Sequence, residues 1–101
     1  MFIYNVTTQI SHQIHEAWLA WMQEKHIPEV MATDCFTKFQ FVRLLEVDES
    51  DSVTYATQYY AASKANYNRY IQLYANALRE EALKSWGNNA IGFRSLMQVV
   101  Q

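Results

Sequence analysis

The sequence predicts an α+β fold of the ferredoxin-like type, in which a four-stranded antiparallel sheet carries two helices on one face. Four segments show the two-residue alternation of strands, and two segments show the three-to-four-residue spacing of amphipathic helices. They follow one another in the order β-α-β-β-α-β, which is the split βαβ arrangement. Right-handed crossovers then place both helices on the same face of the sheet.

The first strand is predicted over residues 2–10, where one alternating set is apolar and the other is mixed. Ser11 is the expected N-cap of the helix that follows. We expect this helix to end near His26, because Pro28 disfavours helical geometry at Ile27. Pro28 can open a short extra turn over residues 28–32. The helix should face the sheet with Ile14, Ala17, Trp18, Trp21 and Met22.

The central hairpin comprises residues 36–47 and 53–61, which flank the acidic loop 48–52. Pairing Val47 with Val53 sets Phe41 opposite Tyr59. The apolar face so formed should lie under the helices, and the other face is mixed.

The second helix is expected from its N-cap Ser63 to Trp86, with Gly87 in the left-handed conformation that ends it. Its apolar stripe consists of Tyr67, Tyr70, Ile71, Tyr74 and Leu78. The last strand is predicted over residues 91–100. Its more apolar set, which includes Phe93, is assigned to the helix-covered face, and the set containing Arg94 to the mixed face.

Composition excludes several classes of function. The chain has 101 residues, a formal net charge of -2 and one cysteine, which suits one domain over residues 1–101 without an internal disulfide. Neither a basic surface for nucleic acid nor the ~20-residue apolar run of a membrane span is present. With no signal-peptide pattern, the expected location is cytoplasmic.

Several segments resemble a known family. They are residues 3–7, 18–22, 26–33, 53–59 and 93–95. The chain resembles, over essentially its whole length, the short bacterial proteins of domain of unknown function 4286. That family looks similar to the dimeric α+β barrel group, in which two ferredoxin-like subunits pack sheet to sheet. The resemblance implies a homodimer but assigns no activity and no catalytic residues.

The mixed face is the candidate site. Several aliphatic residues on a face without helices form a patch that a monomer rarely leaves exposed, which favours a dimer interface that encloses a pocket. The candidate ligand-binding residues there are Asn5, Gln40, Gln58, Tyr60 and Arg94.

No metal or cofactor is expected. His12, His15 and His26 lack the converging ligands that a metal needs, and His26 is only a nominal haem ligand. Cys35 is expected to be a buried, inert thiol. Arg43 can pack its stem on an edge strand, or pair with an acid such as Glu16 or Glu29.

The leading hypothesis is therefore a homodimeric α+β barrel protein of undetermined activity that binds a small molecule between its two sheets. The alternative is a cofactor-independent monooxygenase or isomerase acting on a small aromatic or carbonyl substrate. In that case amides and Arg94 would hold an oxyanion and Tyr60 would act as acid or base. Whether the chain is an enzyme stays open at this point.

Overall fold

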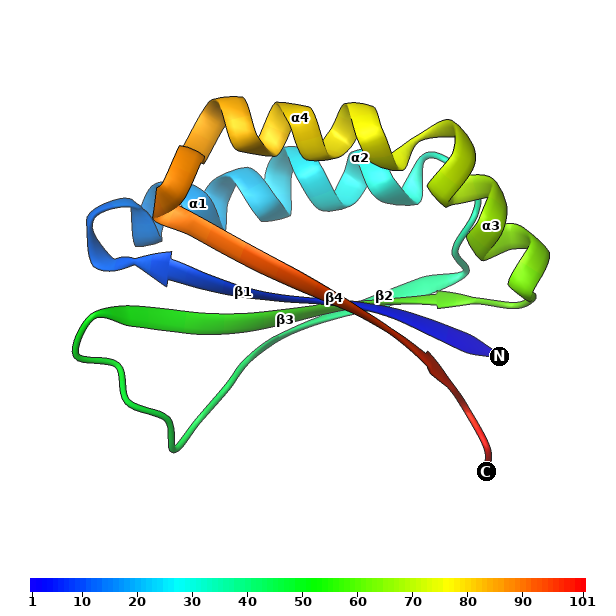
Figure 1. The fold of residues 1–101 in the computed structure, drawn as a ribbon, viewed down its shortest axis with the longest axis horizontal. Helices are drawn as coiled ribbons and strands as arrows, with labels where there is room; N and C mark the ends of the chain where they lie inside the picture. The colour runs from blue at the N-terminus through cyan, green and yellow to red at the C-terminus, as the bar shows by residue number, and fades with distance from the viewer.

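A computed structural model describes all residues from 1 to 101. Four strands form one antiparallel sheet in the order β2-β3-β1-β4, namely β1 (Phe2–Ser11), β2 (Lys38–Arg43), β3 (Ser52–Ala61) and β4 (Ala90–Gln98). All helices cover one face of this sheet (Figure 1). The prediction of a ferredoxin-like fold is confirmed. None of the helices has the length and apolar character that crossing a membrane requires.

The first helical segment is longer than predicted. It begins with the 3-10 turn His12–Ile14, continues as α1 (His15–Trp21), widens into the π-helical turn η2 (Met22–His26) and ends as α2 (Ile27–Met31). The predicted end near His26 is wrong, since Ile27 is helical with φ -60° and ψ -46°. Proline lacks the N–H that an α-helix uses, so the helical bonding pattern has to change near Pro28. The π-helical turn ends two residues before it, at His26.

The two predicted N-caps have different outcomes. Ser63 is confirmed, because its hydroxyl accepts a hydrogen bond of 3.1 Å from the backbone N–H of Asn66. Ser11 is not a side-chain cap; its hydroxyl donates to Oδ1 of Asn89 at 3.1 Å. The hydroxyl therefore ties the start of the first helical segment to the turn before β4.

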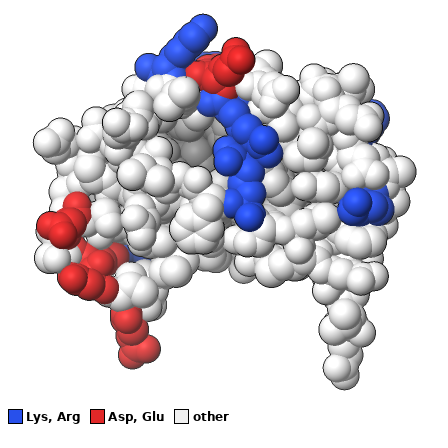
Figure 2. All heavy atoms as spheres, viewed as in Figure 1, with Lys and Arg blue, Asp and Glu red and all other residues white.

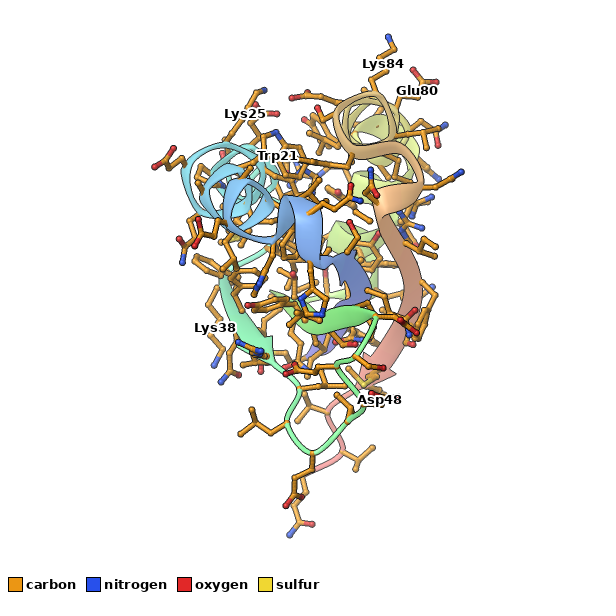
Figure 3. The ribbon with its side chains drawn as sticks, turned by 90° about the vertical axis from the view of Figure 1, so that its left-hand side faces the viewer. Trp21, Lys25, Lys38, Asp48, Glu80 and Lys84 are labelled. Atoms are coloured by element: carbon orange, nitrogen blue, oxygen red, sulfur yellow. The ribbon has the colours of Figure 1, made fainter.

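The second helical segment is divided into α3 (Lys64–Leu73) and α4 (Ala75–Trp86). The break falls at Tyr74, whose φ of -125° is not helical. After α4, Gly87 has the predicted positive φ, 56°, and the 3-10 turn Gly87–Asn89 leads into β4. In Figure 3, α4 lies beside α1 and α2 above the sheet, with Trp21 between the two helical segments.

The hairpin has the predicted faces but a different register. Phe41 lies opposite Thr57, and Phe39 lies opposite Tyr59, so β2 is displaced by two residues from the predicted pairing. A displacement of two residues leaves every side chain on its expected face. The connecting loop, residues 44–51, is longer than expected and is held to β2 by the ion pair of Arg43 with Glu49 at 2.9 Å. Neither acid expected as a partner of Arg43 is used.

The faces of β4 are the reverse of the prediction. Val6 lies opposite Arg94, and Tyr4 lies opposite Leu96, so Arg94 and Leu96 share the helix-covered face with the core residue Tyr4. The apolar set with Phe93 occupies the open face, where Ile91 is 58% exposed and Phe93 is 57% exposed.

The core lies between the sheet and the helices. Trp18 is a core residue as predicted, and Trp21 is half-buried at its edge. Aromatic rings fill the middle of this layer, with Tyr4 stacked on Phe36 and on Tyr59, each at 6.1 Å between ring centroids. Cys35 is buried, as expected, and carries a free thiol.

Candidate functional site

Four of the five predicted site residues lie together on the open face. Gln40 pairs with Gln58 and Gln58 pairs with Asn5, so the three amides form a row across β2, β3 and β1. Tyr60 lies one row away and its hydroxyl donates to Oε1 of Gln40 at 3.5 Å. Asn5 is buried, and its Oδ1 has no hydrogen-bond partner.

Arg94 does not join this row, which corrects its predicted placement. Ser95, not Arg94, lies opposite Asn5. The physical reason is the packing of β4. Its small residues Ala90 and Gly92 face the helices, and alternation then sends Arg94 to the same side. An alternating pattern alone does not say which of its two sets faces the helices.

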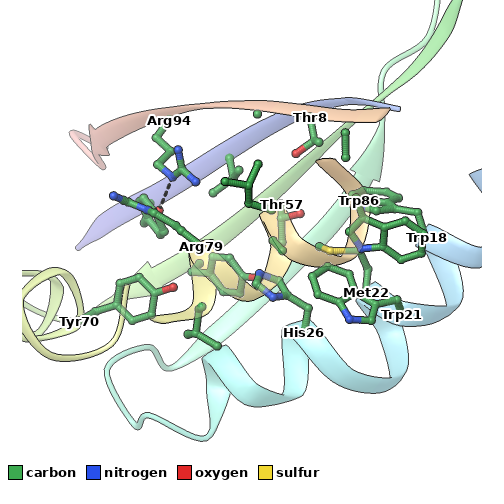
Figure 4. A pocket seen from close by; sticks show the side chains of 18 residues that line it. Thr8, Trp18, Trp21, Met22, His26, Thr57, Tyr70, Arg79, Trp86 and Arg94 are labelled. Atoms are coloured by element: carbon green, nitrogen blue, oxygen red, sulfur yellow. Dashed lines mark hydrogen bonds between the residues drawn. The ribbon is translucent and has the colours of Figure 1, made fainter. Parts of the chain in front are cut away.

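A cavity of about 350 Å³ lies on the helix-covered side, where Arg94 is found. Its walls come from β1, β3 and β4 on one side and from both helical segments on the other (Figure 4). Most of the lining is apolar or aromatic. It consists of Tyr4, Val6, Thr8, Trp18, Trp21, Met22, His26, Thr57, Tyr59, Tyr70, Leu78, Arg79, Ala82, Leu83, Trp86, Ala90, Gly92 and Arg94.

Gly92 helps to keep this cavity open. A Cβ atom placed on Gly92 would lie 3.5 Å from Oγ1 of Thr8 and 3.6 Å from Cγ1 of Val6, which are ordinary van der Waals distances. The backbone thus tolerates a side chain at this position, and a larger one would extend into the space under α4. The missing side chain is therefore part of what forms the cavity.

Three side chains meet at the polar end of the cavity. The Tyr4 hydroxyl accepts a hydrogen bond of 3.1 Å from Nη2 of Arg79 and another of 3.1 Å from Nε of Arg94. The latter bond is drawn in Figure 4. The two arginines come from α4 and β4, so the site exists only because these elements fold onto β1.

The charge of the cavity is positive. Neither Arg79 nor Arg94 is in an ion pair, and no aspartate or glutamate is among the lining residues. Figure 2 shows basic side chains along one side of a hollow, while the acidic ones on this face gather away from its floor, above it and around the loop 44–51.

Three buried polar atoms of the lining have no hydrogen-bond partner. They are the Tyr59 hydroxyl, Nε of Arg79 and Nε1 of Trp86. Burial raises the pKa of the Tyr59 and Tyr70 hydroxyls, so both stay protonated and able to donate. Buried polar groups are normally paired, and these three atoms of lining residues have no partner within the chain.

His26 is the titratable base of the site. Its imidazole stacks on Trp21 with 4.7 Å between ring centroids. Burial lowers its pKa; Glu29 and Glu81 oppose this effect, and Lys25 and Arg94 add to it. The ring is therefore neutral near pH 7 and can accept a proton. The neighbouring Lys25 points outward to Glu29, at 2.5 Å, and to Glu81 of α4.

The other two histidines lie elsewhere. Nε2 of His12 is 2.7 Å from the carbonyl oxygen of Glu49, and Nε2 of His15 is 2.6 Å from the Tyr55 hydroxyl. No group of three or more His, Cys, Asp or Glu side chains is arranged to hold a metal ion.

Sequence reasoning missed Arg79 and gave His26 no role beyond that of a nominal haem ligand. A signal for Arg79 was present. It lies four residues after Ala75 and three before Ala82, so it shares the inward face of α4 with small apolar residues. A lone cation at helical spacing within an apolar stripe indicates a charged group that is directed into the interior. The π-helical turn that accompanies His26 has no comparable sequence signal.

Solved structures share this fold. A dimeric ferredoxin-like protein from an uncultured marine organism has a TM-score of 0.76 and 13% identity, covering 99% of this chain and 95% of that one. An ethyl tert-butyl ether D family protein from Bacillus halodurans has a TM-score of 0.70 and 13% identity, with 99% and 100% covered. SnoaB, a cofactor-independent oxygenase from Streptomyces nogalater, has a TM-score of 0.65 and 12% identity, with 99% and 94% covered.

At these identities the likeness concerns the fold and not the activity. No curated protein matches the chain by sequence. The family described as Domain of unknown function (DUF4286) matches residues 1–100. The chain belongs to that family.

Proposed function

We propose that this protein is a homodimer in which each subunit binds a small planar organic molecule in the cavity between its sheet and its helices. The observation that carries the proposal is the set of unpartnered donors at Tyr59, Arg79 and Trp86 within an aromatic cavity. Ligand sites combine apolar walls with a few convergent polar groups. This cavity lies within one subunit, whereas the candidate site of the sequence analysis lies on the open face of the sheet.

The open face of the sheet supports the homodimer. It exposes Ile91, Phe93 and Met97 beside the row of amides. The loop 44–51 and the C-terminus both project beyond this face (Figure 1). They carry Leu45, which is 77% exposed, and Val100, which is 91% exposed. An apolar surface of this kind is covered in most proteins, and a second copy would cover it sheet to sheet.

The binding proposal is tested by filling the cavity. Gly92→Leu places a side chain under α4, whereas Ser95→Leu places the same side chain on the opposite face of β4. With 2-naphthoate and 2-naphthamide as planar probes, titration calorimetry should give one site per chain for the wild type and for Ser95→Leu. Binding should be lost in Gly92→Leu. Equal binding by both variants, or no binding of either probe by the wild type, would contradict the proposal.

A cofactor-independent oxygenase or isomerase is the second candidate, and the position of His26 favours it. Both reactions begin when a base removes a proton from a C–H or O–H acid and the electron pair moves onto an oxygen. The proton would pass to the neutral imidazole of His26, while Tyr4 and the arginines would stabilise the oxyanion. Some of the solved structures with a similar fold are described as an oxygenase or a monooxygenase, which is consistent with this candidate.

This candidate can be tested without oxygen. 2-Tetralone is a two-ring ketone whose C1 hydrogens exchange with D2O through an enolate, and NMR follows the exchange. The wild type should accelerate exchange and His26→Gln should not, while His12→Gln serves as the matched control. If His26→Gln matches the wild type, His26 is not the base.

A further inference from the structure

The charges around the cavity do not balance. Arg79 and Arg94 both line it, and neither pairs with an acid. The acid of α4 that forms an ion pair, Glu81, is bound to Lys25. Arg79 is partly buried, with its Nε atom inaccessible to water. A cation that is removed from water needs a counter-charge, and the chain supplies none within the cavity.

The cavity also has more hydrogen-bond donors than acceptors. The Tyr4 oxygen has two lone pairs, and both accept from guanidinium groups, Arg79 Nη2 and Arg94 Nε. Its own proton is thus left free to donate. Arg79 Nε and Trp86 Nε1 are donors only, and both are buried without an acceptor. The cavity therefore has an excess of donors and needs a molecule that brings acceptors.

The shape of the site selects among acceptors. A guanidinium group presents its donors in a planar fork that matches the two oxygens of a carboxylate. Most of the remaining lining, including Trp18, Trp21 and Met22, is apolar or aromatic. A compact, fully hydrated inorganic anion would leave this apolar surface uncovered, whereas an organic acid with a planar body would cover it.

We propose that the ligand is an organic carboxylate with a planar, aromatic-sized body. Its carboxylate lies against Arg79, Arg94 and the hydroxyl of Tyr4, and its body lies among the tryptophans. Arg94 is exposed on the edge strand β4 and contacts the carboxylate at the entrance of the cavity. Arg79 contacts it from the side of α4. This inference rests on the proposed function and specifies the ligand of the same cavity.

The test compares 2-naphthoate with 2-naphthamide, which have the same body and nearly the same shape but differ in charge. The wild type should bind the carboxylate at least about tenfold more tightly, because hydrogen bonds to charged groups contribute more than neutral ones. Arg94→Gln and Arg79→Gln should each weaken binding of the carboxylate about tenfold. Binding of the amide should change little in either variant.

Arg69→Gln is the matched charge control, since Arg69 lies on α3 and donates to the backbone oxygen of Asp34. It should bind both probes as the wild type does. Arg94→Gln alters an exposed position, so it keeps the test valid if Arg79→Gln fails to fold. Equal affinity for the two probes, with both still excluded by Gly92→Leu, would overturn the carboxylate inference and leave the proposed function standing. Failure of both probes to bind would overturn both proposals.

Discussion

Arg94 donates from Nε to the hydroxyl of Tyr4 over 3.1 Å, and this bond joins the edge strand β4 to the aromatic core. Tyr4 is 4% exposed and packs on Phe36, Tyr59, Tyr67 and Tyr70. Since Arg79 of α4 donates to the same oxygen, one phenol links two elements that follow each other in the chain. These two hydrogen bonds lie at the polar end of the cavity.

Replacing Tyr4 by phenylalanine should therefore destabilise the protein while leaving its packing in place. The variant leaves Arg79 and Arg94 without their shared acceptor, and a hydrogen bond to a charged group contributes about 1.5–3 kcal/mol. We expect the free energy of unfolding to fall by about that amount in urea titrations. Tyr60→Phe is the control, because its hydroxyl makes only a 3.5 Å contact on the open face. Equal losses in the two variants would show that the Tyr4 hydroxyl has no special role.

Truncation of Trp18 should lower the free energy of unfolding more than truncation of most other residues in the first helical segment. Trp18 is 2% exposed and contacts Phe41 and Tyr55, with ring centroids 5.8 Å and 5.4 Å away. Trp18→Ala should lower the free energy of unfolding by about 3–5 kcal/mol. Leu73→Ala, at a position on α3 that is 65% exposed, should change it by about 0.5 kcal/mol or less. A loss below about 1 kcal/mol for Trp18→Ala would contradict the assigned packing.

The topology could be predicted from the sequence because each element has its own periodic signal. The faces of β1, β2 and β3 followed from alternation, since Tyr4 and Tyr59 belong to clearly apolar sets. A two-residue error in the β2 register did not matter, because Phe41 still points toward the helices. The local pattern was enough to predict the buried face of a strand wherever helices of the same chain cover that face.

The candidate site was harder to predict, and β4 shows why. Its apolar set with Phe93 is suited to burial, but it lies on the face that a second subunit would cover. The set with Gly92 and Arg94 faces a cavity that the chain leaves unfilled. A rule that assigns the larger apolar residues to the helix-covered face fails where that side holds a cavity and the open face is the proposed dimer interface.

This reversal gives a direct test of the homodimer. Phe93→Glu places a charge on the open face, and burying an unpaired charge in an interface costs several kcal/mol. We expect light scattering to show that Phe93→Glu is a monomer near 11.9 kDa and the wild type a dimer of about twice that mass. Leu96→Glu is the matched control, since it makes the same change three residues along β4 on the helix-covered side. The interface proposed here is contradicted if Leu96→Glu separates the subunits and Phe93→Glu does not.

The stability of the protein should fall as the pH drops below the ordinary pKa of histidine, because of His26. Burial lowers the pKa of the folded imidazole, so between the folded and unfolded pKa values the unfolded chain binds more protons. Stability then rises with pH through this window. The contribution of His26 is complete above the unfolded pKa of about 6.5 and declines as the pH falls below it. Glu29 and Glu81 reduce the shift, whereas Lys25 and Arg94 enlarge it.

The measurement is the free energy of unfolding in urea near pH 5.5 and near pH 7.5, for the wild type and for His26→Gln. Asp48 and Glu49 have lowered pKa values, so their titration lies below this window and does not interfere. The wild type should lose stability at the lower pH, and His26→Gln should lose less. The exposed neighbour Lys25 is the control position. The charge of Lys25 lowers the pKa of His26, so Lys25→Gln should reduce the dependence of stability on pH without abolishing it. If His26→Gln loses as much stability between the two pH values as the wild type does, the fold does not hold the imidazole neutral.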